Sequence, residues 1–411
     1  MKMKLTCAAA ALCCLSTAAL AVDVGGVEVT GYSRGGGVYS YNKDQQVKGG
    51  LSLGGDLQKY RLGNEGDYGV EVNIAKTFDV EGLKYKLDYM PTKWNSDNVG
   101  TEQAFVEMSG LSFAPEAKVW VGQRRLRIQD VHIVDHFLMD YGVNQGAGFT
   151  DLSVGGLKVG AALQTGDTFD KKMAVGTSAN KLNVDISEIN TNAGGKARVL
   201  LTSVSTSGLA SSGGSGFTVS HNQSDFLTKG LTNSLFLQTS SGYANINGRF
   251  GDISAATVYG KKTNRIADSI NWQVGRFGGQ ALLGYQTTKS DDPTKAYTIK
   301  DTSLGGRISY AYSKNFKMLV EAGTTSRKFS DNQEAQRLNK LTIAPTLALA
   351  EDFWSRPELR FYVTRANWNA AAATANSATT DAAGVSQANT GFGANGRTSQ
   401  TLAGVQYEVW W

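Results

Sequence analysis

Cysteine is nearly absent from this sequence, and its three cysteines, Cys7, Cys13 and Cys14, all lie close to the N-terminus. The remaining chain therefore excludes disulfides, thiolate catalysis and cysteine-based zinc sites. An excess of charge of one sign is also missing, because 41 lysines and arginines nearly balance 36 aspartates and glutamates. Without a strongly basic balance, we expect no nucleic-acid partner.

Long hydrophobic runs are lacking too, except at the N-terminus. There the basic start Met1-Lys2-Met3-Lys4 precedes the apolar stretch Leu5–Leu20, and Ala19-Leu20-Ala21 has the form of a signal-peptide cleavage site. A membrane-spanning helix would need about 20 apolar residues, so this stretch is short for an anchor. We expect residues 1–21 to be a cleaved secretory signal peptide and residues 22–411 to form one exported domain.

The C-terminal residues alternate strictly between apolar and polar side chains. One parity holds Val405, Tyr407, Val409 and Trp411, and the other holds Gly404, Gln406, Glu408 and Trp410. Successive side chains of a strand point to opposite faces, so one face is apolar and ends in an aromatic residue. An apolar outer face over a polar interior is typical of a transmembrane β-barrel strand.

Similar alternation recurs along the chain, for example at Val27–Arg34, Tyr243–Phe250, Gly306–Tyr312 and Leu359–Arg365. Clusters of glycine, serine, asparagine and aspartate separate these segments, and no segment has sustained helical periodicity. The pattern predicts an all-β fold, a transmembrane antiparallel β-barrel. At about 10 residues per strand, the length suits roughly 16 to 18 strands.

Four stretches depart from this alternation. Residues 164–196, 203–216 and 369–400 are polar or of low complexity, which predicts long exposed loops. The stretch Ile128–Gly148 mixes acids and histidines with many apolar residues and does not alternate. It is too apolar for a free loop, so we expect it to pack against the inside of the barrel wall.

Strand parity predicts which side chains face the channel. Tyr32 shares a parity with Arg34, Trp410 with Glu408, and Phe236 with polar neighbours, so we expect these three aromatic residues in the channel. The interpretation that they belong to the aromatic belt against lipid stays open. The same reasoning places a set of charged residues in the channel wall: Arg34, Arg61, Glu71, Arg249, Arg360 and Glu408. It treats residues 59–65 as part of the second strand, and one bulge would reverse a face.

The sequence gives little support for a catalytic site or a metal site. His132 and His136 are spaced as on a zinc-binding helix, but the segment lacks helical signals and the glutamate of that motif. An acid pair such as Asp135 and Glu408 is common in pores, and no nucleophile or phosphate-loop motif is present. We expect no enzymatic activity, no metal and no cofactor.

Several motifs resemble the maltoporin family of sugar-specific outer-membrane porins. They occur in order along the chain: Gly31-Tyr32-Ser33-Arg34, Lys59-Tyr60-Arg61-Leu62-Gly63-Asn64-Glu65, Val119-Trp120-Val121-Gly122, Asp130-Val131-His132 with Asp135, Phe353-Trp354-Ser355-Arg356-Pro357, and Glu408-Val409-Trp410-Trp411. Residues of about 160–330 match only in their strand pattern.

The resemblance implies an 18-stranded barrel, assembled as a homotrimer, whose third loop, at about 126–148, folds inward as a constriction. It also implies a row of aromatic residues along the channel, flanked by charged residues that bond sugar hydroxyls. On the matching motifs, Tyr32, Phe137 and Trp410 take aromatic positions, and Arg34, Arg61, Glu71 and Asp135 take polar ones. Trp94 resembles the aromatic residue that the family contributes from a neighbouring subunit.

The chain also departs from the family pattern. Gly69 and the position near Leu347 stand where the family has aromatic channel residues, and Val106 stands where it has an arginine. Another family arginine, just before Asp130, falls on Ile128 or is replaced by Arg127. Phe137 replaces a tyrosine.

These features together predict a channel in the outer membrane of a Gram-negative bacterium, surrounded by membrane lipid. It would pass sugars by facilitated diffusion, with maltose, maltodextrins or related oligosaccharides as the expected substrates. Two alternatives remain: a non-specific diffusion porin for small hydrophilic solutes, and a secreted carbohydrate-binding β-protein.

Overall fold

The structure, a computed structural model, describes residues 22–40, 50–166, 176–209, 213–251, 253, 260–293, 296–330, 333–376 and 396–411. The expected signal peptide, residues 1–21, lies outside the described residues. The strands are β1 (Val22–Val24), β2 (Val27–Ser40), β3 (Gly69–Val80), β4 (Leu83–Trp94), β5 (Gly100–Ser109), β6 (Lys118–Val131), β7 (His136–Val154), β8 (Leu157–Gly166), β9 (Ser178–Asn192), β10 (Gly195–Ser207), β11 (Gly213–Ser224), β12 (Leu231–Gly242), β13 (Lys262–Val274), β14 (Phe277–Ser290), β15 (Tyr297–Ser313), β16 (Phe316–Phe329), β17 (Gln336–Ala348), β18 (Glu358–Trp368) and β19 (Ser399–Trp410).

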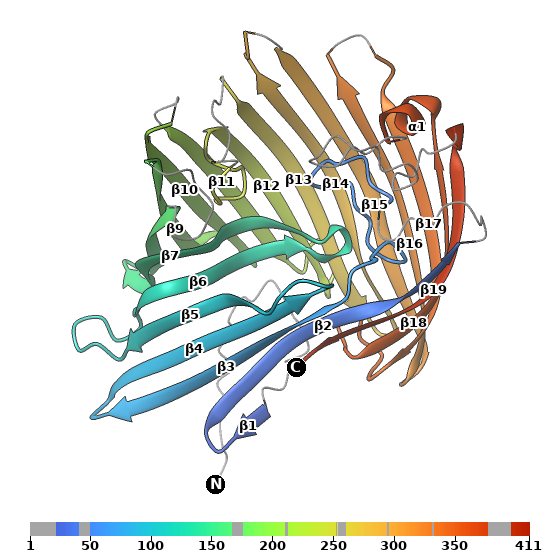
Figure 1. Cartoon of the computed structure of the whole chain (residues 1–411). Coiled ribbons are helices and arrows are strands. Elements are labelled where there is room, and N and C mark those ends of the chain that lie inside the picture. Colours follow the sequence, from blue (N-terminus) through green and yellow to red (C-terminus); the bar gives the residue numbers. More distant parts are fainter. Residues whose placement is uncertain are drawn as a thin grey trace.

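The strands form a closed antiparallel barrel (Figure 1). Each strand from β2 onward pairs with the next along the chain, and β19 pairs with β2 to close the ring. β1 is a three-residue strand that pairs with β2, so the ring itself has 18 strands. The predicted 18-stranded barrel is therefore confirmed. Closure leaves no free edge in the described ring, because each of its 18 strands pairs on both sides.

The two faces of the wall differ as the alternation predicts. On β18 and β19 the outward residues Phe361, Val363, Val405 and Tyr407 are exposed, whereas the inward Glu408 is fully buried. This is the arrangement of a barrel whose outer face meets lipid. Among the described residues, no helix is both long and apolar enough to cross a membrane.

Short turns join the strands at the end where both chain termini lie, and longer connections lie at the other end (Figure 1). Two of the predicted long loops are wrong in extent. Residues 178–192 form β9, and residues 203–216 include the ends of β10 and β11. The composition of these strands, rich in serine and asparagine, resembles that of loops, so the sequence pattern did not predict them. The stretch 369–400 contains helix α1 (Ala370–Asn376), while its residues 377–395 lie outside the described residues.

The expected inward constriction is present, but it is the bent end of a β-hairpin rather than an irregular loop. β6 and β7 stay paired as far as Val131 and His136, and the short 3-10 helix η1 (His132–Val134) joins them. Three register shifts in β6, between Arg125 and Asp130, accompany the bend. We call residues 131–139 the hairpin tip.

The hairpin tip crosses the lumen to the opposite wall. Ile133, Leu138 and Met139 are fully buried in one cluster with inward residues of β12, β13 and β14: Phe236, Ala267 and Leu282. Hydrogen bonds also fix the backbone of the hairpin tip. Gln280 accepts one from the Ile133 amide (3.0 Å), and Gln238 donates one to the Leu138 carbonyl (2.7 Å). The cluster explains why this stretch is rich in apolar residues inside a polar channel.

A second inward element corrects the prediction that residues 59–65 belong to a strand. Residues 50–68, between β2 and β3, run inside the barrel along its wall (Figure 1). Tyr60 lies against Gly305 and Gly323, where an added Cβ would overlap its ring. The Leu62 carbonyl accepts a hydrogen bond from Lys340 (2.6 Å), and the Arg61 amide donates one to Ile133 of the hairpin tip (3.0 Å).

Candidate functional site: a channel cavity

The two inward elements leave a cavity of about 860 Å³ inside the barrel. Its lining comes from β2 to β6, the hairpin tip, residues 50–68, the connection after β12 and the C-terminal strand. The lining residues are Tyr32, Arg34, Arg61, Asp67, Glu71, Trp94, Glu102, Gln103, Arg125, Arg127, Asp130, His132, Asp135, His136, Phe137, Asn247, Arg249 and Trp410.

Aromatic side chains occupy one wall of this cavity. Trp410 on β19 is directly opposite Tyr32 on β2 in the strand register, as the parity of the two terminal strands predicts. The ring of Trp94, at the end of β4, lies 6.3 Å from the Tyr32 ring between centroids. Trp94 lines the cavity of its own chain, and its expected contribution to a neighbouring subunit stays a prediction. Phe137 lines the cavity from the hairpin tip.

Each of these rings has a guanidinium group over it. Arg34 lies 5.1 Å from the Trp94 ring centroid, Arg356 lies 4.2 Å from that of Trp410, and Arg127 lies 4.6 Å from that of Phe137. A guanidinium over an aromatic face is held by attraction to the ring quadrupole. The wall thus alternates flat apolar surfaces with strong hydrogen-bond donors.

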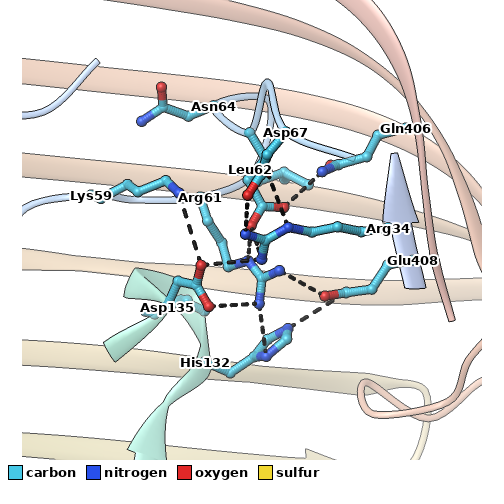
Figure 2. A network of polar contacts seen from close by, with 12 residues as sticks. Arg34, Lys59, Arg61, Leu62, Asn64, Asp67, His132, Asp135, Gln406 and Glu408 are labelled. Atoms are coloured by element: carbon cyan, nitrogen blue, oxygen red, sulfur yellow. Dashed lines mark hydrogen bonds and ion pairs between the residues drawn. The ribbon is translucent and has the colours of Figure 1, made fainter. Parts of the chain in front are cut away.

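A network of charges surrounds the hydroxyl group of Tyr32, and Figure 2 shows the charged residues of this network. Arg34 pairs with Glu65 (2.8 Å) and Asp67 (2.6 Å), and Arg61 pairs with Glu65 (2.7 Å) and with Glu408 (2.9 Å). The Tyr32 hydroxyl donates to Glu408 (2.9 Å) and accepts from Arg61 (2.9 Å). These bonds connect β2, β19 and residues 50–68, and they hold the Tyr32 ring in place.

The hairpin tip joins this network through His132 and Asp135. Asp135 accepts a hydrogen bond from Arg34 (3.1 Å). Burial opposes ionisation of the Asp135 carboxyl, but the charges of Arg61, Arg34 and Lys59 outweigh it and lower its pKa. Burial lowers the pKa of His132 to about 3, so its imidazole is neutral near pH 7. The tip therefore presents a fixed carboxylate and a neutral ring to the cavity.

A second group of charges faces the network from β3, β5, β6, β7 and the connection after β12. Arg125 pairs with Glu71 (2.8 Å) and Glu102 (3.3 Å), and Arg249 pairs with Asp140. Arg127 has looser partners, with Glu102 and Asp140 each 3.9 Å away. Opposite charges thus alternate around the cavity.

The structure brings most of the predicted site residues to the cavity: Tyr32, Arg34, Arg61, Glu71, Trp94, Asp135, Phe137, Arg249 and Trp410. Three lie behind its surface. Phe236 is covered by the hairpin tip, while Arg360 and Glu408 are buried and ion-paired to each other. Parity predicts their inward direction but not what covers them.

Sequence reasoning missed Arg125 and Glu102, which line the same cavity. Arg125 lies next to the register shifts of β6, where strict alternation fails, and Glu102 lies near the start of β5. Alternation over residues 100–109 could have found Glu102. Nothing in the described part of the chain gathers three or more histidine, cysteine or carboxylate side chains in a form that could hold a metal ion.

Comparison with known proteins agrees with this architecture. A maltoporin of Hahella chejuensis is 27% identical over 420 residues, which cover 95% of this chain and 94% of the relative. A maltoporin of Vibrio cholerae serotype O1 is 27% identical over 411 residues, covering 88% of this chain and 93% of the relative. These relatives are channels rather than enzymes.

Solved porins share the fold. Pseudomonas aeruginosa OpdQ superposes with a TM-score of 0.52 at 7% identity, covering 94% of this chain and 99% of OpdQ. OccK3 of the same species gives a TM-score of 0.51 at 9% identity, covering 93% and 95%. The family model described as LamB porin matches residues 27–411. The resemblance in the motifs is thereby confirmed, and the chain belongs to the LamB family of outer-membrane porins.

Proposed function

We propose that this porin passes sugars across the outer membrane by facilitated diffusion, with maltose, maltodextrins or related oligosaccharides as substrates. The observation that carries the proposal is the aromatic wall of Tyr32, Trp94 and Trp410, set beside the paired arginines and carboxylates. The names of the relatives support the choice of substrate.

The geometry matches the two surfaces of a pyranose ring. Its C–H face can stack on the aromatic rings, and each such contact contributes about 0.5–1.5 kcal/mol. Its hydroxyls can accept from arginines such as Arg34 and Arg125 and donate to carboxylates such as Asp135 and Glu71. Several weak sites in series let a sugar enter without being trapped, so diffusion down a gradient suffices.

The predicted site residues take two roles in this proposal. Tyr32, Trp94, Phe137 and Trp410 offer stacking surfaces, while Arg34, Arg61, Glu71, Asp135 and Arg249 exchange hydrogen bonds with the sugar. Glu408 and Arg360 do not contact the sugar in this proposal. Glu408 positions Arg61 and the Tyr32 hydroxyl, and Arg360 pairs with Glu408. Phe236 supports the hairpin tip and contributes no stacking surface.

We further propose export by cleavage after Ala21 and assembly as a homotrimer, as the family resemblance implies. Unheated samples extracted from membranes should migrate as a trimer in SDS and shift to the monomer on boiling. Monomer migration without heating would contradict the trimer. The alternative of a secreted carbohydrate-binding protein is set aside, because the chain belongs to a porin family.

Swelling of proteoliposomes distinguishes the proposed channel from a non-specific porin. In isosmotic maltose or maltotriose, vesicles with the protein should swell faster than the sugars' size alone predicts. Sucrose and raffinose, of matched mass, serve as controls. If swelling rates follow molecular mass alone across the whole panel, the non-specific porin is the correct function.

Replacing the hairpin tip should widen the pore. In a variant in which residues 131–136 become a short Gly-Ser link, single-channel conductance should rise, because Ile133 and its neighbours no longer fill the lumen. The matched control shortens the turn at 225–230, between β11 and β12, in the same way and should leave conductance unchanged. Equal conductance of wild type and tip variant would show that the tip does not limit the pore.

A further inference from the structure

Five basic residues lie near the loop end of β13 to β17, which is the end of the barrel away from the chain termini in Figure 1. Lys262, Lys289, Lys300, Lys328 and Arg337 are all exposed. Each lies on the same face of its strand as exposed apolar residues, such as Ile266 on β13, Leu304 on β15 and Leu341 on β17. These five residues, here called the basic belt, therefore point away from the channel.

The strand register makes the basic belt continuous. Lys262 is directly opposite Lys289, and Lys300 is directly opposite Lys328. Lys300 is directly opposite Thr287, two residues from Lys289, so Lys289 and Lys300 are diagonal neighbours. Arg337 is directly opposite Ser326, two residues from Lys328, so Lys328 and Arg337 are diagonal neighbours as well. Side chains directly opposite have Cβ atoms about 4.5–5.5 Å apart, and like charges in that position destabilise a sheet.

The described residues supply little compensating charge. Lys289 pairs with Asp291 at 2.9 Å. Within the described ranges, the other four side chains have no ion pair with an acidic residue. Two like-charged pairs in register, left largely unneutralised, indicate that an anion from outside the chain belongs at this surface.

The depth of the basic belt points to the class of anion. On β13 the order from the rim is Lys262, Asn264 and Ile266, and on β17 it is Arg337, Asn339 and Leu341. At about 3.4 Å per residue, each of these two cations lies roughly 14 Å along its strand beyond the first exposed apolar residue, which is about 10 Å along the membrane normal for a strand tilted by about 40°. That level is the headgroup region of the leaflet that faces the long loops, where basic side chains extend towards lipid phosphates.

The same level of β9 to β12 is uncharged. Four positions beyond the exposed Leu182, Leu201, Phe217 and Leu237, these strands carry Ser178, Ser205, Gly213 and Ser241. A general requirement for solubility at the rim would spread the charges evenly around the barrel. Lys93 on β4 is also exposed at the loop end, but it stands alone opposite Val70. At this level, only on β13 to β17 does every strand carry an outward basic residue, and this continuity indicates a localised binding surface.

We propose that the basic belt binds phosphorylated lipid headgroups of the outer leaflet. A phosphate group carries several acceptor oxygens and can take hydrogen bonds from both lysines of an opposed pair at once. Its charge removes the repulsion between Lys300 and Lys328 and between Lys262 and Lys289. The site is separate from the channel, so it does not depend on the proposed sugar transport.

Lipid binding by the trimer tests this proposal. Purified protein in detergent is titrated with diphosphorylated lipid A, and with the same lipid after enzymatic removal of both phosphates, and binding is followed by native mass spectrometry. Wild type should prefer the phosphorylated lipid. The variant K300Q/K328Q should bind it about 25-fold more weakly, because each basic residue near an anionic lipid surface contributes about a fivefold gain.

The control variant K229Q/K314Q removes two exposed lysines from turns at the opposite end of the barrel and should bind like wild type. Heat-modifiable migration and single-channel conductance should be the same in all three proteins, which separates lost binding from misfolding. Equal affinity of wild type and K300Q/K328Q would overturn the proposal. So would equal binding of the phosphorylated and dephosphorylated lipids by wild type.

Discussion

Replacing Trp410 with alanine should weaken block of the channel current by maltodextrins about tenfold, which corresponds to a loss near 1.4 kcal/mol. The ring lines the cavity opposite Tyr32 in the strand register, and its truncation removes one stacking surface from the aromatic wall. Ion conductance should change little, because the strand number and the hairpin tip set the pore. Current through single channels, recorded while the sugar concentration rises, measures both quantities.

The matched control is Trp411→Ala. Trp411 lies against Gly31 and continues the ladder with it, because its amide donates to the Gly31 carbonyl (3.2 Å). It has the opposite parity to Trp410, so its loss should reduce the yield of folded protein more than it reduces sugar affinity. If Trp411→Ala rather than Trp410→Ala abolished sugar block, the side-chain directions of β19 assigned here would be wrong.

Replacing Glu408 with glutamine should destabilise the barrel by about 3–5 kcal/mol. The fully buried Glu408 carboxylate pairs with Arg61 and Arg356 (both 2.9 Å) and with Arg360. The glutamine variant therefore removes a negative charge that neutralises three buried guanidinium groups. Removal of one partner from a buried ion pair is costly because the remaining charge stays desolvated. Urea unfolding of the protein in lipid vesicles measures this loss.

Glu28→Gln is the comparison for that variant. Glu28 is exposed near the start of β2, and exposed substitutions change stability by about 0.5 kcal/mol or less. Equal unfolding free energies for Glu408→Gln and Glu28→Gln would mean that the network does not support the barrel.

The wall of the barrel could be predicted from the sequence, because a strand with one lipid-facing side must alternate. The strongest case is the terminal pair: parity alone predicts that Tyr32 and Trp410 face the channel on neighbouring strands, and the register places them opposite each other. Family motifs add residues that parity cannot assign, such as Asp135 on the hairpin tip.

What fills the barrel was harder to predict. Residues 59–65 alternate like a strand, yet they lie inside the lumen, because their alternation serves contacts with Gly305, Gly323 and Lys340 instead of a sheet. Register shifts in β6 make parity fail near Arg125. Phe236 points inward as predicted, but the hairpin tip covers it, and such coverage depends on residues about 100 positions away in the sequence.

Titration of single wild-type channels in a planar bilayer with maltose, maltotriose, longer maltodextrins and sucrose is the most direct measurement of sugar-selective transport. The proposed channel should show reversible, saturable reduction of ion current by the maltodextrins, with affinity that grows with chain length as more rings contact Tyr32, Trp94 and Trp410. Sucrose should reduce the current only at much higher concentration. An ion current that none of these sugars reduces would contradict a sugar-binding channel and would leave a non-specific porin.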